Sequence, residues 1–488
     1  MPRFRALIGS ALGGTAVCTV WAMLLWTADE GRGWLRALRL RGAPAVSAGL
    51  AGFLVFVASA GGHFYSADEW AVYAVAHSVA TRASIQVRDN DPYPLHEMGI
   101  RVVTPPPAQP AAGFSKWPTL PSLAAAPVYA LARTVGSEPD RASEMFANEK
   151  RGRPLISLIA GPSWAAATLA AVVWLLRGAG YGVGTASAAA ALLAFATPWW
   201  PYSKTLLNVV PAGFFLIAGL GAAARSTSGR WMWAALAGGA AELAVATRYE
   251  LLLVVAPLGA LVVVRAWSKI GATPLRGAVV PLVAYLGTWA ATVSIGVLLP
   301  NAMTSGHPLD CGYGTHQTLT GWSNRPHIGI YGILLSPGFG LFVHAPKLAV
   351  GALALVWLWE DSPALASVIA VISVGCVLYY GSFEDWRAGA TWGPRYLVSV
   401  TPLLTLPLAA FLRRNDRNYI AMGAVSGLAL WGIAANGLAV LIAFTRGWQD
   451  LWAMDASLWS ITWTPQFSLI GAQLRLLRLW YEQEQGSF

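Results

Sequence analysis

Residues 155–176 read LISLIAGPSWAAATLAAVVWLL, an unbroken run of apolar and small residues without a single charge. A transmembrane helix needs about 20 such residues to cross the hydrocarbon core of a bilayer. Similar runs recur along most of the chain. The pattern therefore predicts an all-α, polytopic integral membrane protein.

The composition agrees with this assignment. The chain has 488 residues, of which 56% are hydrophobic and only 11% are charged, whereas soluble domains carry about 25% charged residues. Many of the 24 tryptophans lie at the ends of apolar runs, where membrane interfaces favour them. In a soluble protein the net charge of +10 would suggest nucleic-acid binding. Here the basic residues lie in short connectors, so we expect no nucleic-acid partner.

The hydropathy predicts about twelve spans. The run at 347–359 is short and could begin earlier, within 328–346. The expected spans are 6–27, 47–62, 155–176, 182–198, 206–224, 231–247, 250–267, 278–300, 347–359, 364–382, 396–412 and 419–444.

Basic residues mark alternate connectors, which the positive-inside rule places in the cytoplasm. They are Arg32, Arg36, Arg39 and Arg41, then Arg177, then Arg225 and Arg230, then Arg265, Lys269 and Arg276, and finally Arg413, Arg414 and Arg417. This orientation puts the N-terminus outside despite Arg3 and Arg5. A signal-like or extra first segment at 6–27 is the alternative. The predicted location is the plasma (inner) membrane.

The opposite, non-cytoplasmic side receives the long loops 63–153, 198–205, 301–346 and 383–395. We divide the chain into an extra span with its connector (1–46), a transmembrane module (47–445) and a short external tail (446–488). In the first loop, 68–82 has the spacing of a juxtamembrane helix. Residues 104–110 (TPPPAQP) predict a rigid extended stretch, and 119–135 form a second apolar segment.

Two adjacent carboxylates, Asp68 and Glu69, follow the second span in the sequence YSADEW. Neighbouring residues on a helix point in different directions, so their roles should differ. One could be a general base for an acceptor hydroxyl. Alternatively, they stabilise the start of a helix through its free N–H groups and dipole.

Two lysines lie on the side where the charge rule disfavours them. Lys116 stands in GFSKWPTLP and Lys204 in TPWWPYSK. A lysine ammonium can bind a phosphate as a point charge. A lysine that snorkels to the interface is the alternative reading of Lys116.

The loop 383–396 (FEDWRAGATWGPRY) combines carboxylates with Arg387 and Arg395. Guanidinium groups suit bidentate contacts to phosphate. For Arg387, an ion pair with Glu384 or Asp385 is an open alternative. Arg395 begins a span from the non-cytoplasmic side, which favours a functional role.

Other polar groups give weaker signals. His307, Asp310, His316 and His327 could ligate a metal, but their spacing matches no standard site, so a divalent metal cofactor is not supported. Cys18, Cys311 and Cys376 predict no disulfide. The stretch 336–342 (SPGFGLF) is expected to be re-entrant and to line a cavity. An internal ion pair explains Glu242, Arg248 and Glu250.

Carboxylates and cations thus gather on one membrane face, which suits group transfer from a lipid phosphate whose developing charge the cations stabilise. At this point the chain resembles the GT-C membrane glycosyltransferases, which include the protein O-mannosyltransferases and lipid A aminoarabinose transferases. The resemblance covers about 47–445. It rests on the order of YSADEW, FSKWPTLPSLAAAPVYAL, TPWWPYSKTLLN, SPGFGLFVHAP and WRAGATWGPRYL.

The resemblance implies a GT-C-like bundle, a polyprenyl-phosphate sugar donor and inversion at the sugar. It maps the family's acidic residue to Asp68, with Glu69 beside it, its loop-one lysine to Lys116, and its basic residue to Arg395. Lys204 departs from the family, because many relatives carry an acidic residue in that loop. We expect Lys204 and Arg387 to join Lys116 and Arg395 at the donor phosphate. Expected substrate contacts are Tyr65, Trp117, Tyr202, His344 and Tyr396.

The predicted function is transfer of a hexosyl or pentosyl group to an acceptor hydroxyl on a glycan, lipid or protein at the non-cytoplasmic face. The alternative is a twelve-span transporter or flippase for a lipid-linked or amphipathic substrate. Transporters place intramembrane charges on broken helices near the midplane. Such charges are scarce here, which favours the transferase.

Overall fold

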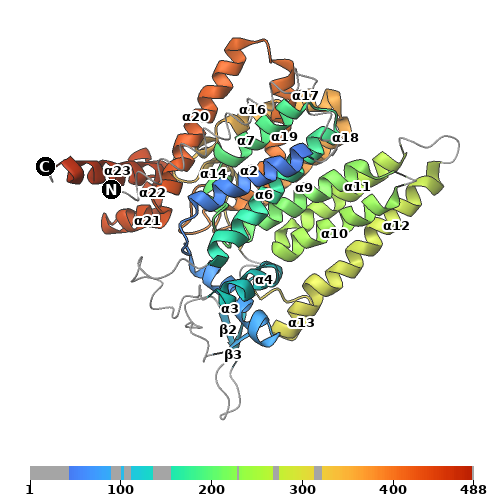
Figure 1. The fold of residues 1–488 in the computed structure, drawn as a ribbon, viewed down its shortest axis with the longest axis horizontal. Helices are drawn as coiled ribbons and strands as arrows, with labels where there is room; N and C mark the ends of the chain where they lie inside the picture. Colours follow the sequence, from blue (N-terminus) through green and yellow to red (C-terminus); the bar gives the residue numbers. More distant parts are fainter. Residues whose placement is uncertain are drawn as a thin grey trace. The chain divides into compact units, whose positions relative to one another are not determined.

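A computed structural model describes residues 43–88, 100–103, 112–135, 155–227, 230–267, 274–312 and 321–485 (Figure 1). The expected span at 6–27, the stretch 104–110 and His316 lie outside the described residues. Contacts between Cα atoms divide the chain into two compact units. Unit 1 comprises Met1–Ser59, Ala165–Ser203 and Gly321–Phe488, and unit 2 comprises Ala60–Trp164 and Lys204–Thr320.

Unit 1 is helical throughout its described residues. Its elements are α2 (Ala43–Ser59), α6 (Leu155–Gly178) from Ala165 onward, α7 (Val183–Phe195), α8 (Trp199–Tyr202), α14 (Pro326–Leu335), α15 (Leu341–His344), α16 (Lys347–Leu353), α17 (Leu355–Asp361), α18 (Pro363–Ser382), η5 (Arg395–Val400), α19 (Thr401–Arg414), α20 (Tyr419–Leu441), α21 (Phe444–Ala453), α22 (Leu458–Trp463), η6 (Pro465–Phe467) and α23 (Leu469–Gln485).

Charged groups at the Arg414 end of α19 connect this helix with α17 and with the segment between α6 and α7. Tyr181 donates its hydroxyl hydrogen to Asp361 at 2.7 Å, and Arg413 pairs with the same carboxylate. Arg414 pairs with Glu360. These basic residues belong to connectors that the sequence places in the cytoplasm.

Unit 2 combines helices with a small sheet. Its elements are α3 (Ala67–Arg82), β1 (Gln86–Arg88), β2 (Ile100–Val103), β3 (Ala112–Ser115), α4 (Leu120–Thr134), α6 up to Trp164, α9 (Val209–Arg225), α10 (Trp231–Thr247), η2 (Tyr249–Val254), α11 (Val255–Trp267), α12 (Pro274–Val293), η3 (Ser294–Leu298) and α13 (Leu299–Ser305).

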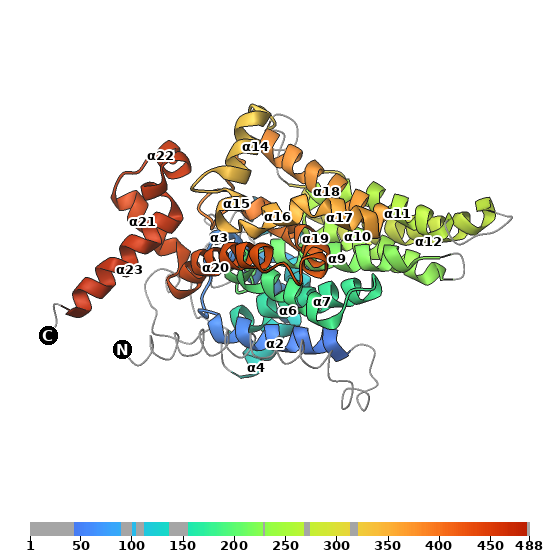
Figure 2. The ribbon, with the colours of Figure 1, turned by 90° about the horizontal axis from the view of Figure 1, so that it is seen from above.

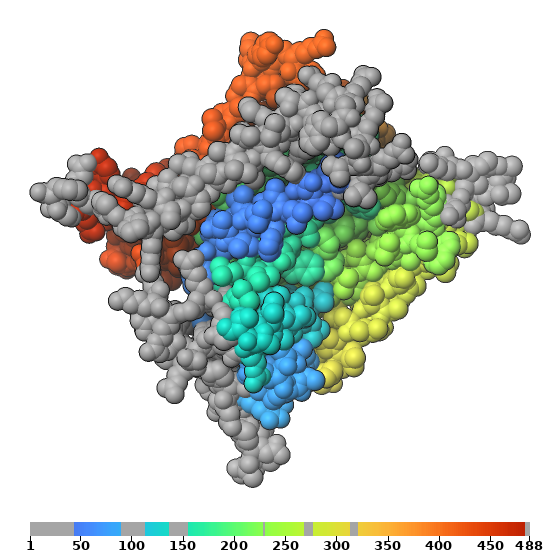
Figure 3. Space-filling model, in the orientation of Figure 1, coloured from blue at the N-terminus to red at the C-terminus, as the bar shows by residue number. Residues whose placement is uncertain are grey.

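Small residues let α10 and α12 approach closely in unit 2. A Cβ on Gly238 would lie 2.1 Å from the carbonyl oxygen of Tyr285, so only glycine fits at this crossing. One turn along α12, Thr288 donates its hydroxyl hydrogen to the carbonyl of Ala235 at 2.8 Å. Such small-residue contacts are typical of helices that pack within membranes. Figures 2 and 3 show α10, α11 and α12 running side by side.

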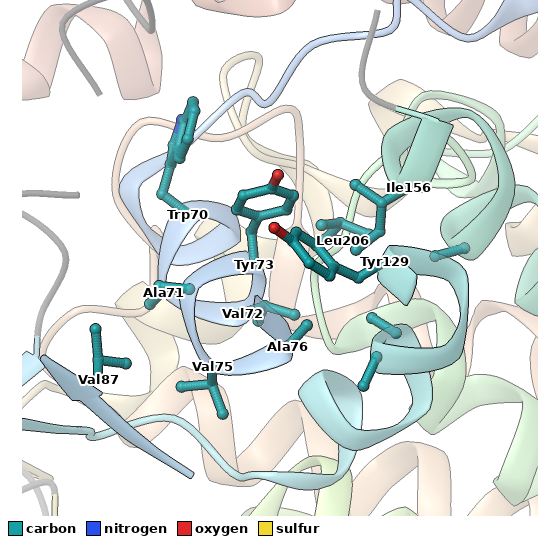
Figure 4. Close-up of a cluster of buried hydrophobic side chains, with 14 residues drawn as sticks. Trp70, Ala71, Val72, Tyr73, Val75, Ala76, Val87, Tyr129, Ile156 and Leu206 are labelled. Atoms are coloured by element: carbon teal, nitrogen blue, oxygen red, sulfur yellow. The ribbon is translucent and has the colours of Figure 1, made fainter. Parts of the chain in front are cut away.

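The first long loop folds into an ordered unit. Its strands form an antiparallel sheet in the order β1-β3-β2, in which Val87 and Val102 both pair with Gly113. Beside it, α3 and α4 share an apolar core, where the rings of Tyr73 and Tyr129 meet edge to face at 5.2 Å. Figure 4 shows these two tyrosines pointing toward each other, with Leu206 nearby.

The expected juxtamembrane helix at 68–82 is α3, and the apolar segment at 119–135 is α4. Every residue of α3 from Glu69 to Ala76 is buried. This burial exceeds that of a helix lying flat on a membrane surface, because α4 and the 204–206 segment cover α3. The sheet was not predicted from the sequence.

Among the described residues, six helices are long and apolar enough to cross a membrane. They are Leu155–Gly178, Tyr249–Trp267, Gly277–Ser305, Pro363–Ser382, Arg395–Arg414 and Tyr419–Leu441. Shorter apolar helices cover Ala43–Ser59, Val183–Phe195, Val209–Arg225 and Pro326–Leu335. The prediction of a helical, multi-pass membrane protein is confirmed. The expected span at 347–359 consists of α16 and α17, which meet at Ala354.

Candidate functional site

The adjacent carboxylates lie in the first turn of α3, in different surroundings. Ser66 occupies the N-cap position, and both Asp68 and Glu69 follow it in the turn, where the helix dipole favours negative charge. Glu69 is fully buried, whereas Asp68 is half-buried. The two neighbours therefore face different environments, and Asp68 is the more accessible of them.

Glu69 joins the start of α3 to a distant part of unit 2. Its Oε1 accepts the backbone N–H of Tyr65 at 3.0 Å, and its Oε2 accepts the backbone N–H of Leu206 at 2.9 Å. A carboxylate that receives two N–H groups satisfies donors that burial would otherwise leave unpaired. These contacts favour a structural role for Glu69.

The same arrangement brings Lys204 close to Glu69. Lys204 is 2% exposed, and its Nζ lies 5.0 Å from the centre of the Tyr65 ring. Burial lowers the pKa of Lys204 to about 7, although the negative charge of Glu69 acts in the opposite direction. Burial, followed by the charge of Glu69, raises the pKa of the Tyr65 hydroxyl. Unit 2 thus brings Tyr65, Glu69 and Lys204 together, and Asp68 precedes Glu69 in the first turn of α3.

Lys116 and Trp117 directly follow β3. The Nζ of Lys116 lies 4.8 Å from the centre of the Trp117 ring, and that ring packs against the core shared by α3, α4 and Leu206. On the other side, a Cβ on Gly312 would lie 3.6 Å from the Cα of Lys116. Lys116 therefore lies between the core of the first loop and Gly312 of the third loop.

A chain of hydrogen bonds organises the predicted residues of unit 1. Tyr202 is fully buried and donates its hydroxyl hydrogen to the carbonyl of Trp392 at 2.9 Å. The indole of Trp392 donates to Asn436 Oδ1 at 3.0 Å. Asn436 in turn donates to the carbonyl of His344 at 2.8 Å. Three segments far apart in sequence are fixed to α20 in this way.

His344 is fully buried in α15, within the predicted third external loop. Its Nδ1 lies 2.9 Å from the carbonyl of Gly340, and its ring meets the Trp392 ring edge to face at 5.3 Å. Burial lowers the pKa of His344 to about 4, although the Gly340 contact opposes the shift. The imidazole is therefore neutral at neutral pH, and Nδ1 is the donor to the carbonyl.

The two arginines of the loop 383–396 have distinct neighbours. Arg387 donates from Nε to Thr462 Oγ1 at 2.8 Å, and its guanidinium lies 4.3 Å from the centre of the Trp386 ring. Arg395 is half-buried at the start of η5. Burial raises the pKa of the Asp385 carboxyl group, although the positive charges of Arg395 and Arg387 act in the opposite direction. Next to Arg395, Tyr396 stacks on Tyr380 with ring centres 4.7 Å apart.

The metal candidates of the third loop do not assemble within the described residues, where no three His, Cys, Asp or Glu side chains gather at metal-binding distance. Asp310 instead accepts the backbone N–H of Gly312 at 2.8 Å. Of the intramembrane group, Arg248 pairs with Glu250. Among the described residues, Cys311 and Cys376 form no disulfide.

The predicted site residues divide between the two units. Tyr65, Asp68, Glu69, Lys116, Trp117 and Lys204 belong to unit 2, and Tyr202, His344, Arg387, Arg395 and Tyr396 belong to unit 1. The sequence pattern did not indicate Asn436, Trp448 or Thr462, because each of them contacts a residue that lies far away in the sequence. For Trp448 and Thr462, the available signal was the density of tryptophans at 448–463.

No known protein family matches the chain, and no curated protein matches it. Among solved structures, the chain is similar to the crystal structure of ArnT from Cupriavidus metallidurans bound to undecaprenyl phosphate. The two share 14% sequence identity with a TM-score of 0.46, over 89% of this chain and 76% of that chain. A similarity of this degree gives no residue of this chain its role.

Proposed function

We propose that this protein is a membrane glycosyltransferase that moves a sugar from a polyprenyl-phosphate donor to an acceptor hydroxyl, on the non-cytoplasmic face of the plasma membrane and with inversion. The observation that carries the proposal is the group at the start of α3. There, a half-buried carboxylate, Asp68, lies next to a carboxylate that holds the segment carrying the buried cation Lys204.

In the proposed reaction, Asp68 accepts the proton of the acceptor hydroxyl while the hydroxyl oxygen attacks C1 of the sugar. A bond forms between this oxygen and C1, and the bond between C1 and the phosphate oxygen breaks. The electron pair leaves with the lipid phosphate. Positive side chains stabilise the negative charge that develops there. Because a phosphate is a good leaving group, the reaction needs no general acid.

Four basic residues are proposed to bind the donor phosphate: Lys116, Lys204, Arg387 and Arg395. Tyr65, Trp117, Tyr202, His344 and Tyr396 are proposed to shape the substrate pocket. Glu69 is proposed to position the site rather than to act as the base.

The test uses purified protein with labelled polyprenyl-phosphate sugars and candidate glycan, lipid and protein acceptors. We expect the wild type to form product and Asp68→Asn to lose transfer by at least about 100-fold, as is usual when a general base is removed. Asp416→Asn, which changes an exposed aspartate in the connector between α19 and α20, serves as the matched control. Wild-type turnover by Asp68→Asn would refute the assignment. Translocation of the lipid across vesicles without transfer would support a transporter instead.

The same assay distinguishes the role of the carboxylate Asp68 from that of the cation Arg395. Arg395→Ala should weaken donor binding by about tenfold or more, because a charge-assisted contact contributes about 1.5–3 kcal/mol. Its apparent affinity for the acceptor should change little. Arg417→Ala, in the exposed connector between α19 and α20, is the control for a lost positive charge. An unchanged donor affinity in Arg395→Ala would remove Arg395 from the phosphate site.

A further inference from the structure

The end of the chain folds back onto the loop that carries Arg387. The spanning helix α20 ends at Leu441, and α21 begins at Phe444 after only two linking residues. We call the segment Phe444–Trp463, which contains α21 and α22, the tail hairpin. Figures 1 and 2 both show its helices together with α23 beyond one end of α20.

One side of the tail hairpin is fixed to the loop 383–396. The indole of Trp448 donates to the carbonyl of Thr391 at 3.1 Å. Thr462 is fully buried and accepts the Nε–H of Arg387 at 2.8 Å. The hydrogen of the Thr462 hydroxyl is donated to the carbonyl of Leu458 at 2.6 Å, which turns the oxygen lone pairs toward the guanidinium.

The tail hairpin also contacts the turn 336–340. The backbone N–H of Gly338 donates to the carbonyl of Thr462 at 3.2 Å. A Cβ on Gly338 would lie 2.2 Å from the carbonyl oxygen of Ile461, so no larger residue fits between them. The hairpin is thereby held at the two loops of unit 1 that the sequence singled out.

The other side of the tail hairpin is exposed and mostly apolar, with Asp455 as an exposed charge at its tip. At its tip, between Trp452 and Trp459, four large apolar side chains are exposed: Trp452 by 59%, Met454 by 47%, Leu458 by 58% and Trp459 by 68%. Two tryptophans with apolar neighbours are typical of segments at the boundary between lipid headgroups and acyl chains. In water, so large an apolar patch would be unfavourable.

The position of the tip favours a bilayer as its partner. The link of two residues keeps the start of α21 next to the Leu441 end of α20, a helix long and apolar enough to cross a membrane. The helix α20 also exposes large apolar side chains of its own, because Leu430 is 66% and Trp431 is 51% exposed. The tip is thus attached by a short link to a helix that itself presents apolar side chains of the kind that face lipid.

We propose that the tip of the tail hairpin inserts into the membrane surface, while its opposite side positions Arg387 through Thr462. When the tip docks on lipid, the hairpin fixes the guanidinium of Arg387. The phosphate of a lipid donor would approach this guanidinium from the same membrane surface. The second half of this statement rests on the proposed function, because it takes Arg387 as a ligand of the donor phosphate. The first half, insertion of the tip, does not depend on it.

Insertion of the tip is tested with nitroxide spin labels in lipid nanodiscs. Trp459→Cys places a label at the tip, and Gln466→Cys places the control label on the exposed turn before α23. We expect the tip label to be more accessible to dissolved oxygen than to a water-soluble nickel complex, and the control label to show the reverse. Equal access of the nickel complex to both labels would overturn insertion. Shielding of the tip from both reagents would indicate a protein partner and would also overturn it.

The positioning role is tested by the affinity for undecaprenyl phosphate. Thr462→Val removes the acceptor of the Arg387 N–H and should weaken binding by about tenfold, whereas Thr462→Ser keeps the hydroxyl and should restore most of the affinity. In the Arg387→Ala background, Thr462→Val should have no further effect. Equal losses in the valine and serine variants, or additive losses in the double variant, would overturn the role of Thr462. If the wild type does not bind the lipid, the proposed function fails, while the spin-label result stands.

Discussion

The fold controls the charge state of Lys204 through burial. A lysine in an unfolded chain titrates at about 10.4, whereas burial lowers the pKa of Lys204 to about 7, against the charge of Glu69. A cation that binds the donor phosphate has to be protonated. We therefore expect the affinity for undecaprenyl phosphate to fall as the pH rises through about 7, measured by binding titrations from about pH 6 to about pH 9.

Lys204→Arg is the control, because an arginine keeps its charge over this range. Titration of the ligand affects both proteins equally, so the difference between their profiles reports residue 204. The free energy of unfolding changes with pH in the opposite direction to the ligand affinity. Between about pH 7 and about pH 10.4 the unfolded state binds more protons, so stability rises with pH in this window. Identical binding profiles for the two proteins would contradict a role for Lys204 at the phosphate.

At the scale of elements, Glu69 connects α3 with the segment 204–206. Glu69→Gln keeps one acceptor oxygen but turns an amide N–H₂ toward a backbone N–H, at Tyr65 or at Leu206. We expect a loss of about 2 kcal/mol in stability, because a buried donor loses a charged acceptor. Thermal unfolding in detergent is the measurement. Asp68→Asn, one residue away and half-buried, should change the unfolding temperature little, so equal shifts would show that Glu69 is no special anchor.

The helices could be predicted because hydropathy is a local signal. The expected span at 155–176 corresponds to α6, and 364–382 corresponds to α18 within one residue at its start. The sheet could not be predicted in this way, because β1 has only three residues and its partner β3 carries Gly113 at the centre. Apolar alternation has no room to develop over such lengths.

Contacts between residues far apart in the sequence could not be predicted from the hydropathy pattern either. The sequence identified Arg387 and Tyr202 as candidates from their residue type and loop position. Nothing local indicates that Thr462 accepts from Arg387, or that the Trp392 carbonyl accepts from Tyr202. Side-chain chemistry thus selected the candidate residues, and packing decided which of them have fixed orientations.

For the whole molecule, the distribution of basic residues and the proposed reaction both depend on which side of the membrane each loop faces. The connector between α19 and α20 carries Arg413, Arg414 and Arg417, whereas the tail hairpin beyond α20 contacts the loop of Arg387. At 1.5 Å per residue, the 23 residues of α20 span about 34 Å, enough to cross the hydrocarbon core once. The connector and the tail should therefore lie on opposite sides of the membrane.

This sidedness is tested with single cysteines in a protein whose three native cysteines are replaced by alanine. Asp416→Cys marks the connector and Gln466→Cys marks the tail, and both positions are exposed. In intact cells we expect a membrane-impermeant maleimide to label position 466 and to reach position 416 only after the membrane is permeabilised, because basic connectors remain in the cytoplasm. Labelling of 416 alone would invert the topology, and would place the proposed transferase site on the cytoplasmic face. Labelling of both positions in intact cells would mean that α20 does not cross the bilayer.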